Sequence, residues 1–197
     1  ASTLVLSMDR NDSGSVAGDA SVRSLDGGEA SLDGLLRLMI NDTGYTSTLE
    51  ETISHVAVSN VRLSSGRLAL RRDNQIQGLR AGEYASLDLY GGSIISSQGV
   101  SNTFSTLTIN GAATMELGSG GELTFSKIGY WGTNSGLPYL VNIENASGTW
   151  NTADSPDVSS EHVWLLSANA LTADQLIQVA FSGYTRGAEL YYHEDLK

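Results

Sequence analysis

Apolar residues recur at a fixed interval between Ser105 and Phe125, and this repeat constrains the fold more than any other feature of the chain. The segment reads STLTINGAATMELGSGGELTF. Two series of apolar residues are each spaced by eight: Leu107, Met115 and Leu123, and then Ile109, Leu117 and Phe125. One polar residue separates the two members of each strand, which is the alternation typical of β-structure. The intervening Asn-Gly and Gly-Ser-Gly-Gly sequences favour turns. We therefore expect three short strands that direct the same two apolar side chains toward one core.

Weaker copies of this pattern lie on both sides of the segment. Upstream they read VRLSSGRLAL and YASLDLYGGSIISS, and downstream YLVNIENASGTW and HVWLLS. Twenty-two glycines and only two prolines provide many turns, and no Pro-rich or charged block marks a domain boundary. We expect a single domain over 1–197. Within it, 1–102 is weakly repetitive, 103–170 contains the clear strand repeats, and 171–197 forms a C-terminal cap.

Two all-β architectures fit strands of this length and spacing. Successive hairpins would give an antiparallel β-sandwich, for which Asn110-Gly111 is a good turn signal. Alternatively, each strand is one side of a coil, and about three strands complete one turn of a right-handed β-solenoid. The small residues in every turn, the similar strand lengths and the low aromatic content of 7% favour the second architecture. We predict an all-β, single-domain, right-handed parallel β-solenoid (β-helix), with the antiparallel sandwich as the alternative.

The segment LTADQLIQVAFSG predicts a short helix near 172–182. Thr172 is a good N-cap residue, and Gln175 completes a capping box. One apolar face is formed by Ala173, Leu176, Ile177 and Ala180, and Gly183 has the usual C′ position. A helix of about two to three turns is not stable alone. We expect it to cover one end of the solenoid, where strand edges and core residues need a cap.

The C-terminal half resembles a known family. The segment LTADQLIQVAFSGYTRGAEL, preceded by VWLLS, resembles the C-terminal part of bacterial autotransporter-associated β-strand repeat proteins, many of which carry a PEP-CTERM sorting anchor. The matching positions are Leu171, Gln175, Leu176, Phe181, Gly183, Gly187, Ala188 and Leu190. The repeats STLTINGAATMELG and GGELTF are also similar to that family, so the resemblance covers about 103–190. It implies an exported β-solenoid that is secreted or lies at the cell surface. It does not imply an enzyme.

Charge and composition exclude several classes of function. The formal net charge is −11, which repels nucleic acid phosphates and anionic membrane surfaces. No apolar run approaches the ~18 residues that a membrane-spanning helix needs. We therefore expect neither a nucleic acid partner nor membrane insertion. The absence of cysteine excludes disulfides, thiolate metal sites and cysteine nucleophiles. The Ala-Ser start fits a mature exported chain left by signal peptidase.

The stretch MDRNDSGS resembles the first half of a calcium-binding loop. Asp9, Asn11 and Ser13 place oxygen atoms at alternate positions before a glycine. Ala20 occupies the position where such loops have a bidentate glutamate, and Asp19 would replace it only with different geometry. The other interpretation is a polar turn between two strands. Calcium is the only cofactor that the sequence indicates.

Two further stretches carry residue types used in carbohydrate chemistry. GYWGTNSGLPYL contains Tyr130, Trp131 and Tyr139, and exposed aromatic rings on a β-scaffold bind sugar rings. The alternative is that Trp131 covers the edge of the sheet where a longer loop leaves it. TADSPDVSSEH contains Asp154, Asp157 and Glu161, and paired carboxylates act as acid and base in sugar cleavage. We favour a solvated acidic loop there and assign no catalytic residue.

The preferred function is that of a non-catalytic extracellular structural protein of a bacterial cell surface, fibre or matrix. Self-association is expected, since solenoid ends and strand edges can pair with another copy. The segment Thr3, Leu4, Val5 and Leu6 is the candidate strand for this pairing. An adhesin or carbohydrate-binding module with a polysaccharide partner is the first alternative. A polysaccharide-cleaving β-helix enzyme is the second.

Overall fold

The computed structural model describes residues 5–8, 20–22, 37–49, 55–118, 120–144, 162–167 and 171–181. The strands are β1 (Val5–Met8), β2 (Ala20–Val22), β3 (Arg37–Leu49), β4 (Val56–Ala57), β5 (Asn60–Ala69), β6 (Ile76–Gln77), β7 (Ser86–Leu89), β8 (Ser93–Ser96), β9 (Ser101–Ile109), β10 (Ala113–Glu116), β11 (Glu122–Trp131), β12 (Thr133–Asn134), β13 (Leu137–Pro138), β14 (Val141–Glu144), β15 (His162–Leu165) and β16 (Val179–Phe181). Among these residues α1 (Ala173–Ile177) is the one helix. The part of the chain that the structure describes is therefore mostly β, as predicted.

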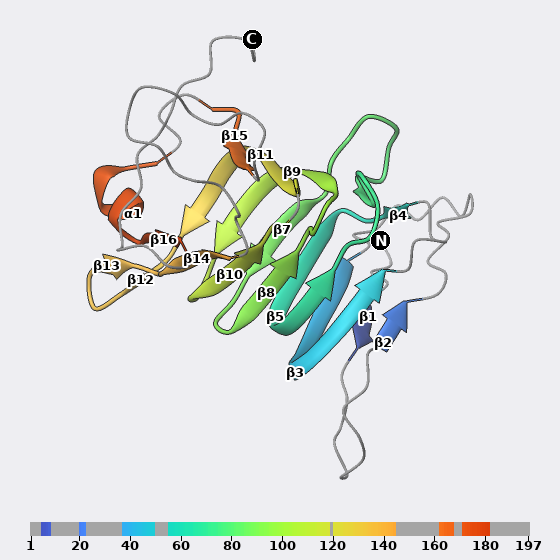
Figure 1. The fold of residues 1–197 in the computed structure, drawn as a ribbon, viewed down its shortest axis with the longest axis horizontal. Helices are drawn as coiled ribbons and strands as arrows, with labels where there is room; N and C mark the ends of the chain where they lie inside the picture. The colour runs from blue at the N-terminus through green and yellow to red at the C-terminus, as the bar shows by residue number, and fades with distance from the viewer. Residues whose placement is uncertain are drawn as a thin grey trace.

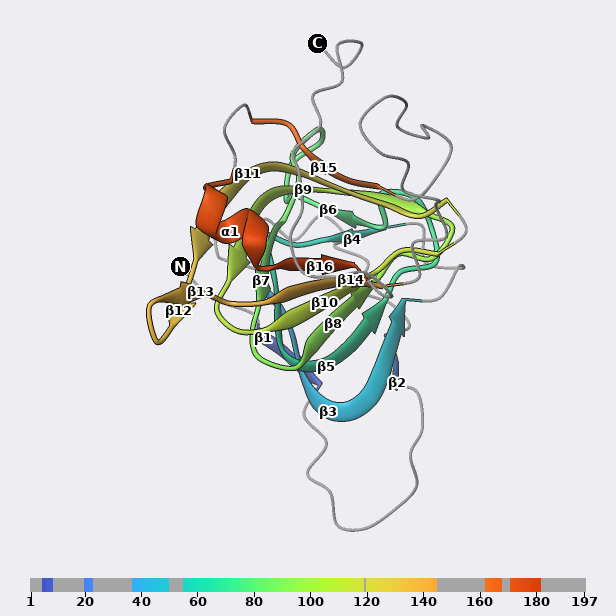
Figure 2. The same ribbon diagram turned by 60° about the vertical axis from the view of Figure 1, so that its left-hand side comes forward.

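Twelve of the described strands form one curled sheet. Its strand order is β15-β11-β9-β7-β5-β8-β10-β14-β16, with β3 paired to β5 and both β1 and β2 paired to β3. The strands lie side by side, from β1–β3 at one end to β15 and β16 at the other (Figure 1). Seen from the second direction, the sheet curls so that β9 and β11 lie across the interior from β10 and β14 (Figure 2).

The strand pairs of this sheet are parallel. Between successive strands the partners recur about 20 residues apart, as in Leu87 with Leu107 and Ser93 with Ala113. Antiparallel pairing is confined, among the described residues, to the β12–β13 hairpin. The alternative prediction of an antiparallel sandwich is therefore wrong.

The Asn110-Gly111 turn shows why the hairpin signal was misleading. This turn stacks on the turn at Tyr90-Gly91-Gly92, where the backbone N–H of Gly92 donates to the carbonyl of Ala112 at 2.8 Å. A Cβ atom on Gly111 would lie 2.2 Å from the backbone nitrogen of Gly91. Glycine is thus needed at 111 so that two turns can approach closely, and not for the positive φ angles of a hairpin.

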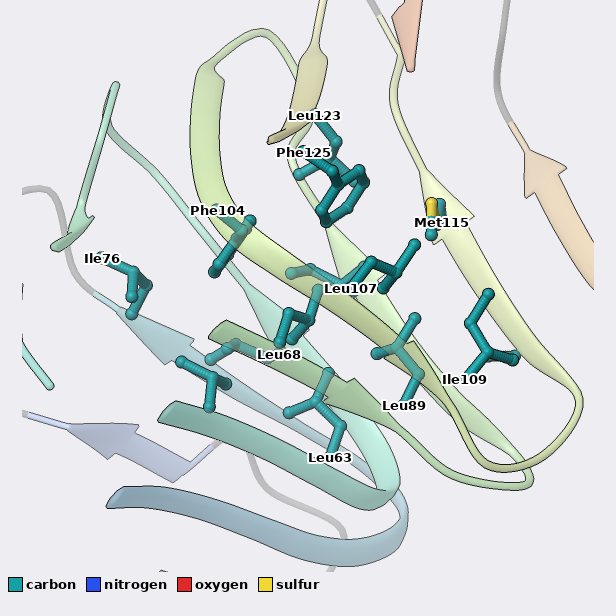
Figure 3. Packing of buried hydrophobic residues seen from close by; sticks show 14 of the residues in the cluster. Leu63, Leu68, Ile76, Leu89, Phe104, Leu107, Ile109, Met115, Leu123 and Phe125 are labelled. Carbon is teal, nitrogen blue, oxygen red and sulfur yellow. The ribbon is translucent and has the colours of Figure 1, made fainter. Parts of the chain in front are cut away.

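The interior of the curled sheet is one hydrophobic cluster. It includes all six residues of the two eight-residue series, each at most 2% exposed, so the expectation that they share a core is confirmed. Figure 3 shows Leu107, Met115 and Leu123 directed inward from β9, β10 and β11. The rings of Phe104 and Phe125, which are partners in neighbouring strands, stack with centroids 5.8 Å apart. Contacts of this kind between successive strands make the core continuous along the sheet.

Buried polar side chains hold the corner between β8 and β9. Gln75 and Ser97 are fully buried and Asn102 is 1% exposed; we call these three residues the corner cluster. The Asn102 Oδ1 atom accepts a hydrogen bond from the backbone N–H of Gln75 at 2.9 Å. The Asn102 Nδ2 group donates to the Arg72 carbonyl at 3.2 Å and to the Ser97 hydroxyl at 3.1 Å. The Ser97 hydroxyl donates to the Val100 carbonyl at 2.8 Å. These bonds satisfy polar groups that would otherwise be buried without partners.

The C-terminal helix begins as predicted but ends early. The Thr172 hydroxyl accepts from the Gln175 backbone N–H, and the Gln175 side chain accepts from the Thr172 N–H at 2.8 Å, so the capping box is confirmed. The helix ends at Ile177, however, and Gln178 is its C-cap. The predicted extension to 182 is wrong because 179–181 continue as β16, paired in parallel with Val141–Ile143 of β14. Pairing to the sheet replaces the last predicted helical turn.

Candidate binding surface

Large apolar side chains are exposed only where the described chain leaves the regular sheet or near the end of a strand or helix. They are Leu79 and Tyr84 between β6 and β7, Tyr130 near the end of β11, Leu137 in β13, Leu166 after β15, and Ile177 at the end of α1. Elsewhere the large apolar groups of the described strands are covered. Exposed aromatic and aliphatic groups of this kind are the features by which binding surfaces are first recognised.

The β12–β13 hairpin projects from the corner between β11 and β14 (Figure 1). Asn134 pairs with Leu137, so Ser135 and Gly136 form a two-residue turn. Their φ angles are 53° and 86°, which is the pattern of a type I′ turn. The Asn-Ser-Gly sequence is the signal for this turn in the chain. The hairpin residues from 133 to 137 are exposed to solvent.

The three aromatic residues predicted to bind sugar lie together at the base of this hairpin, but they differ in exposure. Tyr130 is 57% exposed, whereas Trp131 is 8% exposed and Tyr139 is half-buried against the core. The Trp131 Nε1–H group donates to the Tyr139 carbonyl at 2.7 Å. Trp131 therefore anchors the hairpin and is not a stacking platform for a ligand, which corrects its predicted role. This position agrees with the alternative interpretation that it covers the sheet edge.

Gly132 allows the two tyrosine rings to meet. A Cβ atom at this position would lie 3.0 Å from Cε2 of Tyr139 and 3.2 Å from Cε1 of Tyr130. Both rings therefore occupy the space above the Gly132 backbone, on either side of the position that a side chain would fill. We call Tyr130 and Tyr139 the tyrosine pair.

Tyr130 also belongs to a row of outward-facing side chains that crosses four strands. Arg62 of β5 pairs with Asp88 of β7, Asp88 with Thr108 of β9, and Thr108 with Tyr130 of β11. We call these four residues the Arg62–Tyr130 row. The Arg62 guanidinium lies 4.3 Å from the centroid of the Tyr90 ring. Sequence reasoning missed Arg62, Asp88 and Thr108, because only the strand register brings them into line with Tyr130.

A buried carboxylate lies on a different part of the sheet. Glu116 is 3% exposed and forms an ion pair with Arg67, which lies two strands away across β8. Its Oε2 atom has no hydrogen-bond partner among the described residues. Glu116 is also the register partner of Glu144 in β14. In the part of the chain that the structure describes, no three His, Cys, Asp or Glu side chains group closely enough to hold a metal ion.

Several predicted sites fall outside the described residues. These are the calcium-loop candidates Asp9, Asn11, Ser13 and Asp19, the acidic-loop residues Asp154, Asp157 and Glu161, and the strand residues Thr3 and Leu4. Val5 and Leu6 belong to β1, where they pair with Arg37 and Leu38 of the same chain.

No protein-family model matches this chain, and neither a curated protein nor a solved structure does. Within the described segments no helix is both long and apolar enough to span a membrane.

Proposed function

We propose that this protein is a non-catalytic extracellular structural protein built as a right-handed β-solenoid. The observation that carries this proposal is the recurrence of parallel partners on different parts of the curled sheet. Leu87 with Leu107 on one side and Met115 with Ile95 on another both advance by 20 residues, as coils of one solenoid would. The corner cluster supports the same interpretation, since its polar groups join successive strands.

Engineered disulfides test the coil geometry, because the chain has no native cysteine. The register pairs Asp88→Cys/Thr108→Cys and Ile94→Cys/Thr114→Cys place Cα atoms about 4.8 Å apart, within the disulfide range. Both pairs should oxidise rapidly. The control Asp88→Cys/Thr106→Cys is displaced by two residues, roughly 8 Å, and should not. Crosslinking of only one register pair would contradict a solenoid coil.

We further propose that copies associate end to end, and the distribution of charge indicates how this is controlled. Residues 55–144 carry six Lys or Arg and six Asp or Glu. Residues 1–54 carry three and nine, and residues 145–197 carry two and seven, so the net charge of −11 belongs entirely to the two flanks. The strands of these flanks lie at opposite ends of the sheet (Figure 1). Like charge at both ends opposes stacking in low salt, and divalent cations relieve it.

Sedimentation velocity and electron microscopy test this association. The protein is compared in chelator, in calcium chloride, and in sodium chloride of equal ionic strength. We expect larger species or fibres with calcium. Equal growth in sodium chloride would show simple charge screening and contradict a role for calcium. Monodisperse monomers in all three conditions would contradict self-association.

The tyrosine pair supports a second candidate function, carbohydrate binding. Tyr130 is exposed beside Tyr139 at the base of a projecting hairpin, and aromatic rings with a polar tip suit sugar faces. A glycan array should give signals that Tyr130→Ala removes. The control Tyr84→Ala changes another exposed tyrosine, on the loop between β6 and β7. An array without signal above background would eliminate this candidate.

A further inference from the structure

The Arg62–Tyr130 row projects from one face of the sheet. The residues that follow its members in the chain, Leu63, Leu89, Ile109 and Trp131, are all buried. Because side chains alternate along a strand, the row itself points away from the core. Neighbouring strands lie about 4.8 Å apart, so the four positions extend over roughly 14 Å at right angles to the strands.

The groups in this row are those that bind sugar hydroxyls and ring faces. The Asp88 carboxylate accepts hydrogen bonds, and the Thr108 hydroxyl both donates and accepts. The Arg62 guanidinium is held over Tyr90, and its Nε atom has no hydrogen-bond partner among the described residues. At the other end of the row is the exposed ring of Tyr130. A few polar groups beside an aromatic surface are typical of sites that orient a ligand.

The charge of this face fits an uncharged ligand. The charged residues that the described strands β5, β7, β9 and β11 place on it are Arg62, Asp88 and Lys127, which mix both signs. The whole of 55–144 is neutral by residue count. Such a face neither attracts a polyanion strongly nor repels a neutral chain.

We propose that the Arg62–Tyr130 row binds a linear, uncharged polysaccharide that crosses the strands, with about one sugar residue over each strand. Tyr130 stacks on the first sugar, and Thr108, Asp88 and Arg62 hydrogen-bond the sugars that follow. The strand spacing is close to the length of one sugar residue, so the repeat of the sheet matches that of the ligand. This inference rests on the carbohydrate-binding candidate above and extends it from one aromatic contact to a row of subsites.

The test is calorimetric titration with uncharged gluco-, manno- and xylo-oligosaccharides of increasing length. In the preferred series, affinity should rise with length up to about four sugars and then level, by roughly three- to tenfold for each added hydrogen-bonded sugar. Asp88→Ala should remove the gain beyond the second sugar and leave the disaccharide affinity unchanged. Thr114→Val, a half-buried outward position on β10, is the matched control for a β-strand surface change and should have no effect.

The outcomes separate this inference from the candidate on which it rests. Binding that depends on Tyr130 but not on oligosaccharide length would overturn the row and leave the tyrosine pair as the site. Binding to none of the oligosaccharides would overturn both. Tighter binding of acidic oligosaccharides, with a steep loss of affinity in salt, would overturn the assignment of an uncharged ligand.

Discussion

Gly91 and Gly111 occupy equivalent positions in two stacked turns, and alanine should have opposite effects at the two sites. At Gly111 a Cβ atom would lie 2.2 Å from the Gly91 nitrogen and 2.7 Å from its Cα atom, both of them backbone atoms that cannot rotate away. At Gly91 an added Cβ would have no neighbour within 4 Å, and its φ angle is outside the left-handed region. The two substitutions therefore differ in packing and not in chemistry.

The size of the difference follows from known substitution energies. Gly91→Ala should stabilise the protein by about 0.4–1 kcal/mol, because alanine restricts the unfolded chain. Gly111→Ala should destabilise it by about 1–3 kcal/mol, since the stacked turns must separate. The variants should therefore differ by about 2–4 kcal/mol, which corresponds to at least about 5 °C in Tm for a chain of this size.

Urea unfolding followed by circular dichroism and by tryptophan fluorescence measures this difference. The slopes of the two transitions should agree, so that the midpoints report stability alone. Equal stability of Gly111→Ala and Gly91→Ala would refute the stacking of these turns. It would also remove the main reason for the glycine in the Asn-Gly pair.

Three further substitutions test other contacts by the same unfolding assay. Trp131→Phe should lose about 1–2 kcal/mol, because the Tyr139 carbonyl loses its donor; an unchanged midpoint would contradict the anchoring role. Asn102→Leu removes three buried hydrogen bonds and should lose about 3 kcal/mol; a loss within error would mean that the corner cluster does not stabilise the fold. Arg67→Met leaves the Glu116 carboxylate buried without its cation and should lose about 1–3 kcal/mol, most of which Glu116→Gln should restore; a double-mutant cycle without coupling would argue against the ion pair.

The core and the start of the helix could be predicted from sequence, because both depend on local pattern. Alternation placed Leu107 and Leu123 inside, and the capping box located Thr172. The end of the helix could not be predicted. Residues from Val179 onward have an apolar pattern that fits either a helical face or a strand, and the free edge of β14 decides between them.

The candidate site was predicted only in part, because exposure and register depend on the whole fold. Tyr130 and Trp131 are adjacent aromatic residues, yet one faces solvent and the other the core. Nothing in the local sequence distinguishes them until the strand direction is known. Asp88 and Thr108 are separated by 20 residues and align only through backbone pairing. An ordinary Asp and an ordinary Thr carry no motif that would select them.

The β12–β13 hairpin has a consequence for how chains of this kind vary. It is inserted between Trp131 and Val141, yet Ile109 still pairs with Trp131 before it and Ala113 still pairs with Val141 after it. Backbone geometry on both sides is thus independent of the peptide between them. Other sequences, or longer ones, could be grafted between Thr133 and Pro138 and would be displayed on an unchanged frame. The fold separates the residues that must be kept from those that can be exchanged, which makes this corner a natural point for acquiring a new specificity.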